Sequence, residues 1–292
     1  MKKLLDKFRH DNRGATLIWV SLAMVAFLSM TALNIDGGYA YAQRRQMQNA
    51  ADAAAIAGAR MRALGGSDAQ VDSAIREYAM ANGADAVSWT YLNGQTTVQV
   101  TASRTFSTFF AGIIGLYQMT ASAVAEASIQ PLSAAGNLLP MIIEDRDFVI
   151  GQTYELWAND PEAPGNFGWL DWDGVPVSSM ELADNIANPS NSGYWAIGDW
   201  VPGCPGVKVG APVRNALSGW IGKHVTIPFY DVVQGQGANT RYRISGFGEF
   251  VLEEFNFHGN DKWVRGHFIR WVELGTGGSG PDRGLTTVRL TG

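Results

Sequence analysis

The chain has 292 residues, a length that allows one large domain or two ordinary ones. Hydrophobic residues make up 46% and charged residues 17%, a composition that excludes a wholly disordered chain. The single cysteine, Cys204, excludes an internal disulfide framework, and the net charge of −5 argues against nucleic acid as a partner.

The composition is uneven along the chain. All eleven prolines lie at Pro131 or later, and eight of the ten tryptophans lie after Gly136. Residues 1–136 carry a net charge of +2, and residues 137–292 carry a net charge of −7. We therefore expect an N-terminal unit over residues 36–130, a linker over 131–140 and a second domain over 141–292.

Residues 14–35 contain no charged side chain, and most of them are strongly apolar. As a helix this run is about 33 Å long, enough to cross a bilayer core of about 30 Å. Basic residues are concentrated in residues 1–13, so the positive-inside rule predicts that this tail is cytoplasmic and that everything after Ile35 is extracytoplasmic. The side chains expected to anchor the span in the lipid bilayer are Ala15, Leu17, Ile18, Trp19, Val20, Leu22, Val25, Phe27, Leu28 and Leu33.

A buried core helix or a cleaved secretory signal would show a similar pattern. Ala40-Tyr41-Ala42 resembles a small-x-small cleavage site. The apolar run, however, is longer than a usual signal core, and Asp36 precedes that site. We favour an uncleaved, single-pass anchor in the cytoplasmic membrane.

An alanine-rich stretch follows the span. Residues 39–64 contain no proline, and residues 50–59 include seven alanines, the best helix formers. The helix is expected to continue from the span into this stretch unless Gly37 and Gly38 interrupt it. Small residues let neighbouring helices approach closely, which predicts helix packing with partner proteins or an oligomer.

Three stretches together resemble the TadE/TadG-like family. They are Arg13-Gly14-Ala15, Asn34-Ile35-Asp36-Gly37-Gly38-Tyr39 and Gln48-Asn49-Ala50-Ala51-Asp52-Ala53-Ala54-Ala55. The positions that carry the family motif are Asp36, Gly37, Gln48, Ala50, Ala51, Asp52, Ala53 and Ala54. The resemblance implies a single-span component of the tight-adherence, Flp-type pilus-assembly machinery, with an exported C-terminal part and other pilus-assembly or envelope proteins as partners.

The chain departs from two branches of that family. Prepilin-like relatives are cut after a glycine and carry a glutamate five residues later, but a cut after Gly14 would place Trp19 at that position. Other relatives carry an adhesion domain whose metal site needs Asp-x-Ser-x-Ser, and this sequence lacks that motif. Neither pilin-like processing nor that metal site is therefore carried over.

In the rest of the N-terminal unit, apolar spacing predicts a helix over residues 67–82 and strands over 96–103 and 119–129. A further short helix is predicted over residues 109–116. Attached to the long first helix, these elements predict a pilin-like α+β unit. A group of apolar side chains here is either a surface for partners or, as we favour, core that packs on the alanine-rich helix: Phe106, Phe109, Phe110, Ile113 and Ile114.

Residues 137–292 are rich in β-branched and aromatic residues separated by glycine, asparagine and aspartate. Strands are predicted over residues 225–230, 240–250, 263–274 and 285–290, and helices over 181–188 and 213–221. The expected fold class is therefore α+β, with a long transmembrane helix, a pilin-like unit and a β-rich barrel or sandwich. The second domain also resembles the exported domains of some TadE/TadG-like proteins.

Signals for catalysis or metal binding are weak. Asp171 and Asp173, with Asp160 and Glu162 upstream, offer carboxylates to calcium, but the other ligands of an EF-hand loop are missing. His258 and His267 lack a third metal ligand, and His224 belongs to no metal-binding motif. No serine nucleophile elbow or phosphate-binding loop is present, so we expect no enzyme, no cofactor and no resident metal.

Four tryptophans have asparagine, aspartate or glycine neighbours, a setting in which indole rings can stack on sugars or line a protein interface. They are Trp169, Trp172, Trp195 and Trp200. We favour a buried aromatic core over such a surface. The leading hypothesis is a non-enzymatic, membrane-anchored component of a Tad-like pilus or surface-adhesion apparatus, and the alternative is a membrane-tethered module that binds glycan or protein.

Overall fold

The computed structural model describes residues 15–157, 166–174, 178–259, 262–278 and 280–291. The chain divides into two compact units. The first unit comprises Met1–Ala54, Ile75–Thr90 and Gln99–Ala125, and the second comprises Ala55–Ala74, Tyr91–Val98 and Glu126–Gly292. The domain boundaries drawn from composition stay a prediction, although residues 131–140 include the strand β4 (Ala134–Gly136) and the fully buried Leu138.

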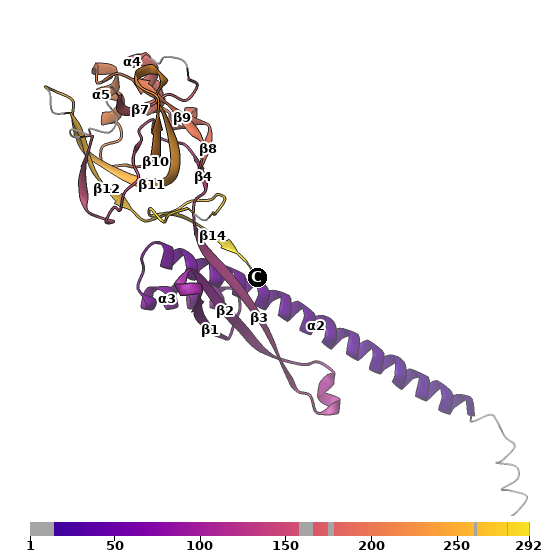
Figure 1. Ribbon diagram of the computed structural model, residues 1–292. Coiled ribbons are helices and arrows are strands. Elements are labelled where there is room, and N and C mark those ends of the chain that lie inside the picture. The colour runs from indigo at the N-terminus through magenta and orange to yellow at the C-terminus, as the bar shows by residue number, and fades with distance from the viewer. Residues whose placement is uncertain (1–14, 158–165, 175–177, 260–261, 279, 292) are drawn as a thin grey trace, which may run out of the picture. The chain divides into compact units, whose positions relative to one another are not determined.

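The first element is α2 (Ala15–Ala63), a helix of 49 residues. Figure 1 shows it as one unbroken helix, so Gly37 and Gly38 do not interrupt it. At 1.5 Å per residue it is about 75 Å long. Gly65, with a left-handed φ of 84°, follows its end, and the N–H of Gly66 donates to the carbonyl of Met61 to close the last turn.

The helix α3 (Asp68–Ala81) confirms the prediction for residues 67–82. A capping box begins it, because the Ser67 hydroxyl accepts from the N–H of Gln70 and the Gln70 side chain accepts from the N–H of Ser67. Gly83, with a φ of 90°, follows its last turn.

The strands β1 (Ala86–Leu92), β2 (Thr97–Ser107) and β3 (Gln118–Pro131) come next. The predictions for β2 and β3 are confirmed, whereas β1 was not predicted. The predicted helix over residues 109–116 is wrong in kind, because only the short 3-10 turn η3 (Ala111–Ile114) forms there. With β14 (Leu285–Leu290) and β13 (Trp271–Val272), these strands form a sheet in the order β1-β2-β3-β14-β13.

The second unit contains a seven-stranded sheet with the path β5-β10-β11-β12-β6, in which β9 also pairs with β11 and with β7. Its members are β5 (Ile143–Glu144), β6 (Thr153–Leu156), β7 (Asn166–Leu170), β9 (Trp200–Pro205), β10 (His224–Gln234), β11 (Arg241–Asn256) and β12 (Trp263–Ile269). β4 pairs with β8 (Tyr194–Ala196). The helices α4 (Ser179–Ala187) and α5 (Ala211–Ser218) and the 3-10 turns η2 (Asn93–Gln95), η4 (Pro189–Ser192) and η5 (Gly237–Asn239) complete the described elements.

The predicted α+β class is confirmed, with a long apolar helix followed by a β-rich region. One predicted strand, over residues 263–274, is corrected: it is two strands, β12 and β13, which join different sheets. Large aromatic side chains fill the core of the second unit. The aromatic side chains that are fully buried there are Trp169, Phe229, Tyr242, Phe250 and Phe268.

Candidate functional site

The N-terminal part of α2 presents apolar side chains on all sides. Leu17 and Trp19 are each 72% exposed and Phe27 is 70% exposed. The other predicted anchor side chains from Ile18 to Leu33 are also exposed, and Ala15 begins the helix. Apolar surface in water costs roughly 25 cal/mol per Å². A helix that is apolar all round therefore needs a nonpolar environment.

Within the part of the chain that the structure describes, one helix is long and apolar enough to cross a membrane, with a mean hydropathy of 2.0 in its best window. Polar side chains near the end of the uncharged run pair with carbonyls of the same helix. Ser29 donates to the carbonyl of Val25 at 2.8 Å, and Asn34 donates to that of Met30 at 2.9 Å. Internal pairing of this kind is what a lipid environment requires.

Asp36 lies directly after the uncharged run and is the first buried side chain of α2. Its carboxylate accepts three backbone hydrogen bonds, from Phe109 at 2.7 Å, Phe110 at 2.9 Å and Ala111 at 2.6 Å. Desolvation opposes ionisation of this group, but the three N–H donors outweigh it, so the pKa of Asp36 is lowered. The ionised carboxylate of Asp36 therefore lies in contact with the loop between β2 and β3.

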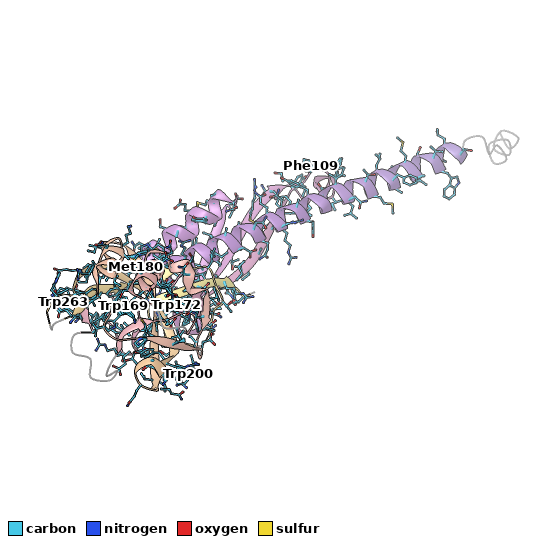
Figure 2. The ribbon with its side chains drawn as sticks, turned by 90° about the horizontal axis from the view of Figure 1, so that it is seen from above. Phe109, Trp169, Trp172, Met180, Trp200 and Trp263 are labelled. Carbon is cyan, nitrogen blue, oxygen red and sulfur yellow. The ribbon has the colours of Figure 1, made fainter. Side chains whose placement is uncertain are left out.

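We call residues 108–117, which connect β2 to β3, the hairpin tip. Figure 1 shows η3 at the end of this hairpin, and Figure 2 shows Phe109 beside α2. The ring of Tyr39 on α2 packs edge-on against Phe106 and Phe109, each at 5.2 Å between ring centroids. The expectation of a core is met by Phe106, which is buried, but not by Phe109, Phe110, Ile113 and Ile114, which are exposed.

The remaining motif residues follow Asp36 on α2. Ala50, Ala51 and Ala54 are fully buried and Ala53 is half-buried. The Gln48 side chain donates to Asp52 at 2.8 Å. Small buried side chains at these positions allow close packing on the helix. Gly37 is exposed with open space around its α-carbon, so no packing contact in the structure requires glycine there.

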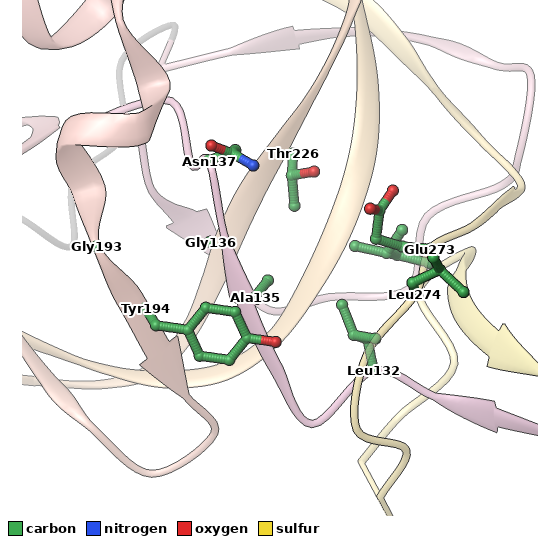
Figure 3. Close-up of a pocket in the computed structure, with 10 residues that line it drawn as sticks. Leu132, Ala135, Gly136, Asn137, Gly193, Tyr194, Thr226, Glu273 and Leu274 are labelled. Atoms are coloured by element: carbon green, nitrogen blue, oxygen red, sulfur yellow. The ribbon is translucent and has the colours of Figure 1, made fainter.

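A separate pocket of about 300 Å³ lies in the second unit (Figure 3). Its polar lining includes Asn137, Thr226 and Glu273, and Tyr194 supplies an aromatic ring. Asn137 has a left-handed φ of 54°, a conformation that asparagine tolerates better than most residues. The pocket therefore combines polar groups with one ring, although sequence reasoning had not singled out any of these four residues.

A buried carboxylate lies beside that pocket. Glu249 on β11 is directly opposite Thr226 on β10 and accepts its hydroxyl at 2.8 Å. The other Glu249 oxygen lies 2.5 Å from Nδ1 of His224, whose ring contacts that of Trp271 in a tilted arrangement with 4.4 Å between the ring centroids. Burial raises the pKa of Glu249, while the bonds from His224 and Thr226 oppose the rise. This pairing accounts for His224 as a structural partner of a buried acid.

The weak calcium candidate is explained by local structure. One oxygen of Asp171 accepts from the backbone N–H groups of Asp173 and Gly174, each at 3.3 Å, as in an Asx turn. Burial and the neighbouring Asp173 raise the pKa of Asp171 to about 6. No group of three potential metal ligands occurs among the described residues, and Asp160 and Glu162 lie outside them. His267 lies 2.6 Å from Glu253, and it and His258 are in no such group.

The four tryptophans proposed for a ligand surface differ from one another. Trp169 is 0% exposed and its ring packs against Trp157 and Phe257, so it is a core residue and is not available to a surface ligand. Trp172 and Trp195 are paired at 5.9 Å between ring centroids. For Trp172, Trp195 and Trp200, the favoured core and the alternative ligand surface both stay predictions. The Cys204 thiol is buried, and burial raises its pKa.

Residues 14–61 match the family model described as putative Flp pilus-assembly TadE/G-like. That segment is Tad-like. It contains the exposed apolar turns of α2, Asp36 and the buried alanines, and its residues 15–61 lie in this one helix. No significant match is found among curated proteins or among solved structures.

The Tad-like segment and the apolar helix together indicate a membrane-anchored, pilus-assembly-related protein. They also suggest contacts with the membrane and with other pilus-assembly components. The sequence alone had indicated the anchor and the motif but not the partner of Asp36, because the tip lies more than 70 residues further along the chain.

Proposed function

We propose that the chain is a non-enzymatic, single-pass component of a Tad-like pilus-assembly apparatus, with residues 1–13 in the cytoplasm and the β-rich domain outside the cytoplasmic membrane. The observation that carries the proposal is the coincidence of the Tad-like segment with one continuous helix. The first half of that helix is exposed and apolar, and the second half is buried through alanines.

In this proposal the two halves of α2 have different tasks. The span holds the chain in the bilayer, and the alanine-rich half lets helices approach closely. The β-rich region, whose core is already filled by its own aromatic side chains, is then free to meet partners through its surface. No step of this function needs a nucleophile, a metal or a cofactor.

Deleting the gene tests the pilus role, with surface pili counted by electron microscopy. We expect loss of pili, restored by the complete chain but not by a chain whose residues 14–35 are replaced with a cleavable signal. A strain that assembles normal pili without this chain would contradict the proposal. Membrane fractionation with cysteine-accessibility labelling on both sides of the span tests the orientation.

The pocket favours a second candidate, a membrane-tethered module that binds glycan. Polar groups beside an aromatic ring, here Asn137, Glu273 and Tyr194, suit a sugar. Glycan arrays probed with the detergent-solubilised chain would test this candidate. Binding that is lost on Tyr194→Ala and retained on Trp169→Phe, a conservative change in the core, would support it.

A further inference from the structure

We infer that the hairpin tip is a second membrane contact, which inserts its apolar side chains into the bilayer interface beside the span. The inference rests on the proposed function in one respect, namely that α2 crosses the membrane. It adds a surface that lies outside the Tad-like segment, which ends at residue 61, and more than 70 residues beyond Asp36 in sequence.

The composition of the tip suits lipid. No charged residue occurs between Arg104 and Glu126, a stretch that contains the whole tip. Within it, Ile113 is 87% exposed and Ile114 is 83% exposed. The neighbouring side chains that are also exposed are Phe109, Phe110, Leu116 and Tyr117. Contiguous apolar surface of this kind marks a protein or membrane contact.

The position of the tip beside the span indicates that the lipid bilayer covers the apolar side chains of the tip. Asp36 is the first residue after the uncharged run of α2, and its carboxylate accepts hydrogen bonds from the backbone N–H groups of Phe109, Phe110 and Ala111. When the run fills the hydrocarbon core, Asp36 lies at the boundary of that core, and the tip lies at the same level. The exposed apolar surface of the span and that of the tip therefore lie side by side.

The chain beyond Asp36 has the features of the headgroup region. Tyr41 is exposed on α2, and Tyr117 is exposed at the tip. Tyrosine is enriched at membrane interfaces, where its ring is nonpolar and its hydroxyl is hydrated. Arg44 and Arg45 are exposed about 12 Å further along α2, within reach of lipid phosphates.

Most backbone N–H groups of the tip are hydrogen-bonded within the protein, which suits a lipid environment. Besides the three N–H groups held by Asp36, the N–H groups of Thr108, Ile113, Gly115 and Leu116 donate to carbonyls within the tip. The Thr108 hydroxyl donates to the carbonyl of Leu116 at 2.6 Å. Unpaired backbone groups are costly in lipid, and these bonds remove most of that cost.

Site-specific fluorescence quenching tests the inference. The buried Cys204 is the only cysteine, so Cys204→Ala gives a background for single labels. An environment-sensitive fluorophore is attached to Ile113→Cys in the full chain. The chain is reconstituted in vesicles of phosphatidylcholine and phosphatidylglycerol that contain lipids with a nitroxide at the top of the acyl chain. We expect roughly twofold quenching at this position, because interfacial side chains insert about 5–10 Å.

Two labels serve as controls. Val124→Cys, on an exposed site of β3 in the same hairpin, should stay unquenched, whereas Leu28→Cys in the span should be quenched by nitroxides deep in the chain. Quenching at Leu28 without quenching at Ile113 would overturn the inference and leave the anchor intact; a partner protein or a second copy would then cover the tip. Absence of quenching at both sites would overturn the anchor and the inference together.

A variant of Asp36 gives an independent test of whether this residue positions the tip. Asp36→Asn replaces one acceptor oxygen by a donor group, so the tip should loosen and quenching at Ile113 should fall toward the level at Val124. Asp52→Asn, a change at the carboxylate that pairs with Gln48 on the same helix, should leave the quenching unchanged. Equal quenching in the Asp36 variant and the parent chain would show that Asp36 does not position the tip.

Discussion

The two units bury their residues in different ways. In the first unit most buried hydrophobic side chains are alanines, among them Ala50, Ala51 and Ala54 on α2. In the second unit the core is built on large rings such as Phe229, Phe250 and Phe268. A core of rings gains its stability from the area that each side chain removes from water. A core of alanines gains little per residue and depends instead on close approach and on specific polar contacts, such as those of Asp36.

This difference predicts opposite sensitivities to side-chain size. The second unit should suffer when a large ring is removed, and the first should suffer when a small side chain is enlarged. The first unit should also depend on individual polar contacts such as those of Asp36, because each buried alanine removes little area from water.

The largest effect is expected for Phe268→Ala. Phe268 is fully buried, and its ring lies within 5.4 Å of those of Phe148, Phe229 and Phe250. Its loss should lower the free energy of unfolding by about 3–5 kcal/mol. Denaturant unfolding followed by tryptophan fluorescence measures this, because most of the tryptophans lie in residues 137–292. Phe268→Leu should cost less than half as much; an equal loss would contradict a packing origin.

A smaller effect is expected for Ala54→Leu in the first unit. The site is fully buried, so the three added carbon atoms must displace neighbours, at about 1–3 kcal/mol. The same change at Ala42, which is exposed on the same helix, should be nearly neutral. Thermal unfolding in detergent, followed by far-ultraviolet circular dichroism, compares the two variants. Equal stability of the Ala54→Leu and Ala42→Leu variants would contradict the expectation that the first unit is sensitive to enlarged side chains.

Asp171→Asn should stabilise the second unit, depending on pH. Because the folded-state pKa of about 6 exceeds the ordinary value of 3.8, the folded chain binds this proton more tightly than the unfolded chain does. The resulting stability is complete below about pH 4 and is lost as the pH rises through 6. The variant should therefore match the parent near pH 4 and exceed it at pH 7.5, by no more than about 1–2 kcal/mol after solvent screening. A gain that is independent of pH would argue against a titration effect.

The smallest effect on global stability is expected for Asp36→Asn, since its three bonds hold one loop. The effect should be local, namely faster hydrogen exchange of the Phe109, Phe110 and Ala111 amides, on the order of tenfold. Exchange measured by mass spectrometry on peptides from the hairpin tip tests this. Unchanged exchange at the tip would show that the alanine-based unit does not depend on this contact.

The local elements could be predicted from sequence because their signals are local. The uncharged run and the alanines indicate α2, and alternating apolar residues indicate β2 and β10. β9 was missed because it contains Pro202 and Pro205, which usually indicate turns. β1 was missed although Val87, Trp89 and Tyr91 alternate with the polar Ser88 and Thr90, which is the pattern of a half-buried strand.

The contacts that give the sites their chemistry were beyond sequence reasoning. Glu249 meets His224 only through the register of β10 and β11, and Asp36 meets the tip across 73 residues. Burial was equally hard to foresee, since Trp169 and Trp172 are three residues apart and only Trp169 is fully buried. Composition indicates which side chains are suited to a core or a surface, but tertiary pairing decides which of them are placed there.

The pairing of β14 with β3 has a consequence for biosynthesis. Leu290 lies opposite Ala127 and Thr286 lies opposite Pro131, so this part of β3 receives its partner from residues more than 150 positions later. During translation, that edge of β3 remains without its neighbour until residues 285–290 have emerged. An unpaired strand edge is open to wrong partners. The interval before β14 arrives is therefore the period in which a chaperone would protect the nascent chain most effectively.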